Sequence, residues 1–183
     1  MKQILVTIIL AAVLTIPLIP EKPESYAADK TESYAVEQPV EAEEQGFTPW
    51  GIPLSDDLQL YIYDLCEEYG ISYAMVIAMI DVESSFDAEA ISSTNDYGLM
   101  QINKINHKDN MDYLNPYDNV KHGIRELHKL TKKYEEADLV AMCWNCGETG
   151  ARKLWEQGIY STEYSRKVME KKIKYERNNG GNC

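Results

Sequence analysis

Apolar positions in the middle of the chain follow helical spacing. After Ser55 and the acidic pair that follows it, apolar side chains recur every three or four residues until Gly70: Leu58, Tyr61, Ile62 and Leu65. Serine is a common N-cap and glycine a common helix stop, so this pattern predicts an amphipathic helix between the two. A similar stripe follows the helix-start sequence Asn115-Pro116 and predicts another amphipathic helix through Val120, Ile124, Leu127 and Leu130.

The segment from Tyr73 to Glu83 is apolar on nearly every side. Ser72 can cap it, and its sequence is Tyr73-Ala74-Met75-Val76-Ile77-Ala78-Met79-Ile80-Asp81-Val82-Glu83. A helix that is hydrophobic all round lies in the centre of a fold. Glu83 therefore stands at the end of a central helix, where its carboxyl group is removed from water.

The remaining patterns complete a mainly helical fold. Asp138 can cap a helix that runs through Trp144, and a last helix is predicted from Thr162 to about Glu176. The segment from Phe86 to Tyr97 contains the turn cluster Ser92-Ser93-Thr94-Asn95 and has room for a loop or a small hairpin. The chain shows no internal repeat and no clear order of strands, so we predict a mainly α domain.

The N-terminal residues predict export. A charge at Lys2 precedes an apolar run from Ile4 to Ile19, and small residues follow at 25–28. This is typical of a secretory signal cleaved after Ala27, and an uncleaved membrane anchor is the alternative for residues 1–27. Either interpretation places the rest of the chain outside the cytoplasm, secreted or anchored in the membrane.

Composition sets the other domain boundaries. Residues 21–45 are rich in Glu, Pro, Ala and Ser and have little to bury, so we assign 28–50 to a disordered acidic linker. Residues 51–177 are then one folded domain, and 178–183 a flexible tail. From Gly51 onward the chain has 22 acidic and 15 basic residues, and its overall net charge is −12. This acidic balance argues against nucleic acid as a partner. Separately, we expect the protein to be a monomer.

Four cysteines occur in this exported chain, at 66, 143, 146 and 183. The Cys143 and Cys146 pair lies three residues apart on a predicted helix, which alone is weak support for a redox or zinc site. We favour buried thiols, or one bridge from Cys66 to this pair, over a metal site.

Several motifs together resemble the lysozyme-like lytic transglycosylases with an SLT domain, especially the small exported type that accompanies secretion and conjugation systems. In chain order they are Ile80-Asp81-Val82-Glu83-Ser84-Ser85-Phe86, Asp96-Tyr97-Gly98-Leu99-Met100-Gln101-Ile102-Asn103, Asn115-Pro116 with Asn119 and Gly123, Ala141-Met142-Cys143-Trp144-Asn145-Cys146-Gly147, and Tyr164. The resemblance spans Leu58 to Val168. It implies a lysozyme-like fold of the goose-type or SLT class, with a short loop or hairpin after the catalytic helix.

By this resemblance Glu83 is the catalytic acid, and its surroundings agree. Desolvation raises the pKa of a carboxyl group, and a glutamic acid that stays protonated near neutral pH can protonate a glycosidic oxygen. The resemblance also implies a set of substrate-binding residues, namely Ser84, Tyr97, Gly98, Met100, Gln101, Asn145 and Tyr164. For Met100, ordinary core packing is the alternative. Trp144 departs from the family, which usually has tyrosine there, so the hydrogen bond of the missing hydroxyl is in doubt.

Asp96 leaves two chemistries open. Its motif is similar to that of animal-type lysozymes, in which an aspartate is the second carboxylate, but an aspartate before glycine also simply starts turns. We expect cleavage of the β-1,4 bond between N-acetylmuramic acid and N-acetylglucosamine in peptidoglycan, with Glu83 as acid and base and 1,6-anhydromuramic ends as products. The alternatives are hydrolysis by Glu83 and Asp96, as in a muramidase, and a non-catalytic wall-binding module of an assembly complex. None of these needs a metal or an organic cofactor.

Overall fold

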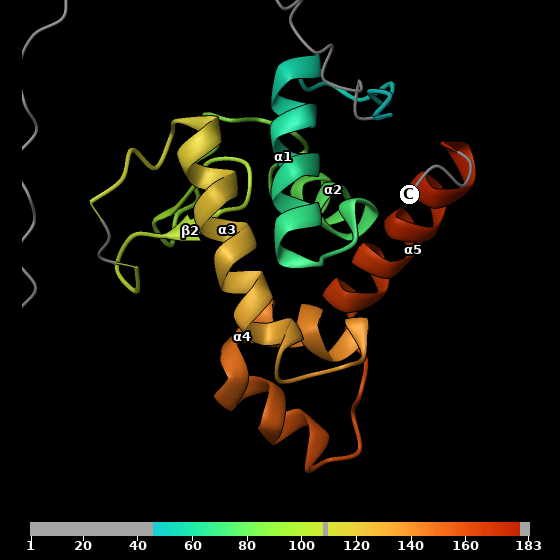
Figure 1. The fold of residues 1–183 in the computed structure, drawn as a ribbon. Coiled ribbons are helices and arrows are strands. Elements are labelled where there is room, and N and C mark those ends of the chain that lie inside the picture. Colours follow the sequence, from blue (N-terminus) through green and yellow to red (C-terminus); the bar gives the residue numbers. More distant parts are fainter. Residues whose placement is uncertain (1–45, 108–109, 180–183) are drawn as a thin grey trace, which may run out of the picture. The chain divides into compact units, whose positions relative to one another are not determined.

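The computed structural model describes residues 46–107 and 110–179 (Figure 1). In this part of the chain, five helices and one short hairpin form the fold. Their bounds are α1 (Asp56–Tyr69), α2 (Tyr73–Ser84), β1 (Asp96–Tyr97), β2 (Ile102–Asn103), α3 (Pro116–Thr131), α4 (Ala137–Trp155) and α5 (Glu163–Asn178). The prediction of a mainly helical domain is confirmed.

The predicted helix starts follow from local hydrogen bonding. The hydroxyl groups of Ser55 and Ser72 accept the backbone N–H groups of Leu58 and Met75, each at 3.3 Å. The side chain of Asn115 caps α3 in the same way, and Gly70 ends α1 in the left-handed conformation. These caps satisfy backbone groups that have no partner inside a helix, so short sequence signals were enough to place the ends.

Helix α2 forms the centre of the domain, as predicted. Every residue from Tyr73 to Ile80 is buried. Helix α2 packs against α5 and α1, and α3 packs against α1 and α4 (Figure 1). The central helix therefore delivers its last turn, with Glu83, to a place where α4 and α5 also meet it.

The start of α4 differs from the prediction. The N-cap is Glu136, which makes no side-chain cap hydrogen bond, and Asp138 lies within the first turn. The Asp138 carboxylate instead accepts hydrogen bonds from Ser161 at 3.2 Å and Ser165 at 3.0 Å. Its tertiary partners on the approach to α5 outweigh the local capping preference. The helix also continues to Trp155, past a break at Gly147, where φ is 70° and ψ is 159°.

The short loop or hairpin predicted after α2 is a small hairpin, and it extends past Tyr97 to Asn103. Asp96 pairs with Asn103 and Tyr97 with Ile102 in antiparallel register. Gly98 opens the connecting turn with φ at 70°, and a Cβ atom there would lie 2.6 Å from Nδ2 of Asn119. Only glycine satisfies both the backbone angle and the close approach of α3.

Aromatic packing extends N-terminally of residue 51. The ring of Phe47 lies 4.7 Å from that of Tyr63, and the ring of Trp50 lies 4.6 Å from that of Tyr73. Phe47 and Trp50 fall within the linker predicted at 28–50, but they pack against the core instead. The proposed signal or anchor at 1–27 and the linker as far as Gln45 lie outside the described residues, as does Cys183.

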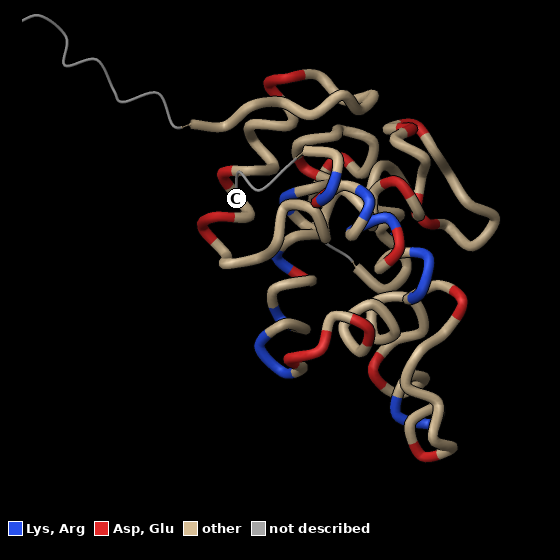
Figure 2. The backbone as a smooth tube through the Cα atoms, turned by 90° about the vertical axis from the view of Figure 1, so that its right-hand side faces the viewer, with Lys and Arg blue, Asp and Glu red and all other residues tan. Residues whose placement is uncertain are grey.

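Lys and Arg positions are interspersed with Asp and Glu positions along the folded part of the chain (Figure 2). Cys143 is buried and Cys146 exposed, and both are free thiols, so a bridge from Cys66 to this pair is not formed. Among the helices of the described ranges, none has the length and apolar character needed to cross a membrane.

Candidate active site

Glu83 lies in the last turn of α2, one residue before the end of that helix. The residue after the helix, Ser85, is left-handed with φ at 53°, and Phe86 is also left-handed with φ at 69°. The chain therefore leaves the buried helix abruptly. This places the Glu83 side chain, which is partly buried, at the boundary between the core and solvent.

Two side chains from distant segments meet the Glu83 carboxyl group. The hydroxyl of Tyr164, on α5, donates to Oε1 at 2.5 Å, and the indole N–H of Trp144, on α4, donates to the same oxygen at 2.8 Å. No side chain of the described residues donates to Oε2. The second oxygen is thus the one available to a ligand.

Polar contacts hold α5 so that Tyr164 reaches Glu83. Asp81, two residues before Glu83, accepts hydrogen bonds from Lys171 at 2.6 Å and from Tyr175 at 2.8 Å. At the start of α5 the buried Ser165 donates to Asp138 of α4. Hydrogen bonds therefore join α5 to α2 and also to α4.

The surroundings favour the protonated form of Glu83. Burial has the largest influence and raises the pKa of its carboxyl group, the hydrogen bonds from Tyr164 and Trp144 lower it, and the charge of Asp96 raises it, with a net rise. Burial and the charge of Glu83 also raise the pKa of Tyr164 well above its ordinary value. Tyr164 therefore remains a neutral hydrogen-bond donor at any physiological pH.

Asp96 has a different environment. Both Ser92 and Thr94 donate to its Oδ2, the former at 2.6 Å, while Asn103 donates to Oδ1 at 2.7 Å. Burial acts to raise the pKa of Asp96, but these three hydrogen bonds together outweigh it, so the pKa is lowered. The carboxylate is ionised and joins the two strands of the hairpin to the turn before them.

Two residues of the predicted binding set serve the interior of the hairpin. Met100 is fully buried, and its sulfur lies where a side chain of Gly123 would be, 2.3 Å from an ideal Cβ. The prediction that Met100 lines a sugar groove is therefore wrong, and its alternative, core packing, describes it. Gly98 is also buried and acts through its backbone, donating to the carbonyl of Ala90 at 2.8 Å.

Gln101 and Ser84 use their donors on the protein backbone. The Gln101 amide donates to the carbonyls of Gly98 at 2.9 Å and Ala90 at 3.2 Å, which leaves its oxygen for other partners. The Ser84 hydroxyl donates to the carbonyl of Ile80 at 3.1 Å, one helical turn back. Ser84 therefore braces the end of α2 and does not hydrogen-bond to the Glu83 carboxyl.

Asn145 and Tyr97 remain accessible. Asn145 is exposed, follows Trp144 on α4, and its side chain has no hydrogen-bond partner among the described residues. Tyr97 is half-buried, with its ring 5.9 Å from that of Tyr113 and beneath the ammonium group of Lys104 at 5.7 Å. Both are free to meet a ligand from the solvent side.

Trp144 is the residue whose role the sequence did not reveal. The loss of a tyrosine hydroxyl at this position implied a lost hydrogen bond. The indole N–H supplies a donor instead and directs it at Glu83. The signal was present in the sequence, since tryptophan is itself a hydrogen-bond donor.

Two hollows in the described part of the chain lie away from Glu83. One, of about 400 Å³, is lined by Gly46, Tyr63, Asp64 and Glu67. The other, of about 480 Å³, lies between α4 and α5 and includes Asp138, Tyr160, Arg166 and Ile173. Neither contains the groups that converge on Glu83.

Comparison with known proteins identifies the fold. The model of the transglycosylase SLT domain matches residues 61–166. Among solved structures, an inactive glutamate-to-glutamine mutant of the lytic transglycosylase Slt from Pseudomonas aeruginosa is similar, with a TM-score of 0.57 and 17% sequence identity. The match covers 70% of this chain and 25% of that protein. No curated protein matches. The lysozyme-like, SLT-type fold is thus confirmed.

Proposed function

Because the chain belongs to the transglycosylase SLT domain family, we propose that it is a peptidoglycan lytic transglycosylase with Glu83 as the only acid and base. The supporting observation is the environment of Glu83. Its carboxyl has a raised pKa, and two neutral donors engage only one of its oxygens. A proton on Oε2 can then be given to a glycosidic oxygen.

The reaction follows from this arrangement. Oε2 protonates the oxygen that leaves with N-acetylglucosamine, and the bond from that oxygen to C1 of N-acetylmuramic acid breaks. Tyr164 and Trp144 stabilise the carboxylate that forms, since both donate to Oε1. The carboxylate next takes the proton of the muramic acid 6-hydroxyl as that oxygen bonds to C1. Glu83 is protonated again, and the product has a 1,6-anhydro end.

The hydrolytic alternative needs Asp96 at the sugar cation. Three donors engage both oxygens of this carboxylate, and all three belong to the hairpin or the turn before it. To attack or stabilise a sugar carbon, Asp96 would have to give up contacts that order the hairpin. This arrangement favours the mechanism in which Glu83 acts alone.

A wall-binding module without activity is the remaining alternative. A protein that only holds glycan has no use for a carboxyl group with a raised pKa and two directed donors. Clearing of a cell-wall suspension by purified protein separates the two, because a binder leaves the turbidity unchanged.

We also propose that the enzyme acts outside the cytoplasm, where its substrate lies. The support is the charged and apolar start of the chain, residues 1–27, followed by an acidic spacer. A spacer of this kind suits an enzyme that opens the wall for a secretion or conjugation complex.

Asp96→Asn distinguishes the two chemistries. We expect activity to stay within about tenfold of wild type, which is less than the loss of a positioned catalytic group causes. The products of both proteins should carry anhydro ends. Mass spectrometry of released muropeptides measures this, with the melting temperature as a check on the hairpin. Reducing ends from the wild type, without anhydro species, would instead place the enzyme among the hydrolases.

Removing the donors to Glu83 should change the pH dependence of the rate. Tyr164→Phe and Trp144→Phe each delete a hydrogen bond that lowers the pKa of Glu83, so its pKa should rise further. Because the acid must be protonated, activity falls as pH rises through this pKa, and the alkaline limb should move to higher pH. We expect the larger movement for Tyr164→Phe, because the Tyr164 hydrogen bond has the greater influence.

The maximal rate should fall by roughly tenfold in these variants, since each removes one charge-assisted hydrogen bond from the carboxylate intermediate. Rate profiles of wall lysis between pH 4 and pH 9 provide the test. An alkaline limb that stays in place in both variants would show that Glu83 does not govern the rate.

A further inference from the structure

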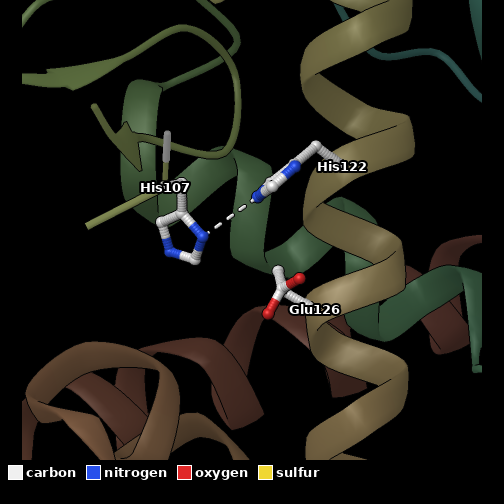
Figure 3. Close-up of side chains that lie close together, drawn as sticks. All are labelled: His107, His122 and Glu126. Atoms are coloured by element: carbon white, nitrogen blue, oxygen red, sulfur yellow. Dashed lines mark hydrogen bonds between the residues drawn. The ribbon is translucent and has the colours of Figure 1, made fainter. Parts of the chain in front are cut away.

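Two histidines and a glutamate converge at the side of α3 that faces the loop after β2. Nδ1 of His107 lies 3.1 Å from Nε2 of His122, and a carboxylate oxygen of Glu126 completes a group in which all ligand atoms lie within 4.8 Å of one another. Figure 3 shows the two imidazole rings meeting beside α3, with the Glu126 carboxylate below them. Neither the family assignment nor the proposed reaction uses these residues.

We propose that His107, His122 and Glu126 bind a divalent transition-metal ion, with Zn²⁺ as the best fit. Two imidazole nitrogens and a carboxylate oxygen are ligands that Zn²⁺ takes when it keeps a fourth position for water. In tetrahedral coordination at 2.0–2.1 Å, two nitrogen ligands stand about 3.3 Å apart. The two histidine nitrogens share a hydrogen bond at 3.1 Å, which is close to this spacing, and the proton between them must leave when the ion binds.

The positions of the ligands are fixed by the fold. His122 and Glu126 lie one turn apart on α3, an i, i+4 spacing that brings both side chains to one face of the helix. His122 is buried. The backbone N–H of His107 donates to the carbonyl of Asn103 at 3.0 Å, and its carbonyl accepts from the hydroxyl of Tyr113. Helix α3 and a hydrogen-bonded turn therefore present the three ligands, which lowers the ordering needed to bind an ion.

The Glu126 carboxylate is the ligand that must move. Its oxygen lies within 4.8 Å of the histidine nitrogens, and ligand atoms around Zn²⁺ stand about 3.3 Å apart, so the oxygen must move by up to about 1.5 Å. Its present partner is Lys129, at 2.5 Å, whose side chain is 60% exposed. An exposed ion pair of this kind contributes little free energy, so Lys129 competes weakly with a divalent ion.

Such an ion would join the loop after β2 to α3. The hairpin that precedes this loop carries Tyr97 and Gln101, so the ion would stabilise the hairpin from the side of α3. The inference does not depend on the proposed function, because its readouts are metal content and thermal stability and not wall lysis.

The test uses the full chain without a polyhistidine tag, stripped with chelator and dialysed against Zn²⁺. We expect one Zn²⁺ per chain in the wild type and a rise in melting temperature on its addition. His107→Ala should weaken Zn²⁺ binding at least about 100-fold and abolish the thermal shift, since it removes one of three ligands. Glu126→Gln should weaken it by about tenfold or more and, since Glu126 is half-buried and an amide has nearly the shape of a carboxylate, tests the site without disturbing the core.

Two matched controls come from the same chain. His128 is the third of its three histidines, lies 2.9 Å from the carbonyl of Tyr69, and is not part of the cluster. His128→Ala and Cys146→Ser should both bind Zn²⁺ as the wild type does. A wild type that retains no Zn²⁺ at micromolar concentration, or His107→Ala and Glu126→Gln variants that bind as tightly as wild type, would overturn the proposal. So would thiolate-to-cobalt absorption in the Co²⁺-loaded protein.

Discussion

Replacing Glu83 by glutamine should reduce the rate of wall lysis by at least about a hundredfold, the usual contribution of a positioned general acid. The amide oxygen can still accept from Tyr164 and Trp144, so the local structure should persist. The amide nitrogen takes the place of Oε2, which has no donor among the described residues, and it cannot deliver a proton to the leaving oxygen. Release of muropeptides from purified cell wall measures the loss.

The same variant should fold at least as well as the wild type. Burial raises the pKa of Glu83 in the folded state, so the free energy of unfolding contributed by this group is present at low pH and lost as pH rises through the raised pKa. Glutamine does not ionise. The wild type should therefore lose melting temperature relative to Glu83→Gln as pH increases above the ordinary range of a glutamate.

Glu89→Gln is the matched control, since Glu89 is exposed in the loop after α2. It should lyse wall at the wild-type rate. Activity of Glu83→Gln within a few-fold of wild type would remove Glu83 from the mechanism.

The central helix and its acid could be predicted because both depend on local signals. Ser72 caps α2 through a hydrogen bond three residues away, and burial of Tyr73 to Ile80 follows from a segment that is apolar on every side. Glu83 stands at the end of that segment. The fold then required only that such a helix be covered by amphipathic neighbours.

The partners of Glu83 could not be predicted from local signals, and only the family resemblance placed Tyr164 close to the acid. Tyr164 and Trp144 lie 81 and 61 residues away in sequence, and their contact depends on how α4 and α5 are packed. The prediction of Asp138 as the N-cap of α4 was wrong for a related reason, because its carboxylate accepts hydrogen bonds from Ser161 and Ser165 at the approach to α5. Local propensity gives way where a tertiary hydrogen bond satisfies the same side chain.

The position of Met100 shows a further limit. An apolar residue in a turn can face either the core or a ligand, and its sequence neighbours are the same in both cases. The space that Met100 fills exists because Gly123 of α3 has no side chain. Only the packing of α3 against the hairpin decides the outcome.

Asn119→Ala should cause a severe loss of stability. Asn119 is fully buried, and its Oδ1 accepts the N–H of Met100 at 2.8 Å. Its Nδ2 donates to the carbonyls of Tyr97 at 2.8 Å and Tyr113 at 2.9 Å. Alanine would leave three backbone groups without their partner, and each buried group left unsatisfied costs about 1–3 kcal/mol.

We therefore expect the free energy of unfolding to fall by about 3–5 kcal/mol, the range of severe single substitutions, with a drop in melting temperature of roughly 10 °C or more. Asn106→Ala is the control, because Asn106 is exposed and its side chain has no partner among the described residues; it should change stability by less than about 0.5 kcal/mol. Denaturant titration measures both. A loss below about 1 kcal/mol for Asn119→Ala would mean that water replaces the amide, and that the hairpin is held to α3 by the packing of Met100 on Gly123 instead of by Asn119.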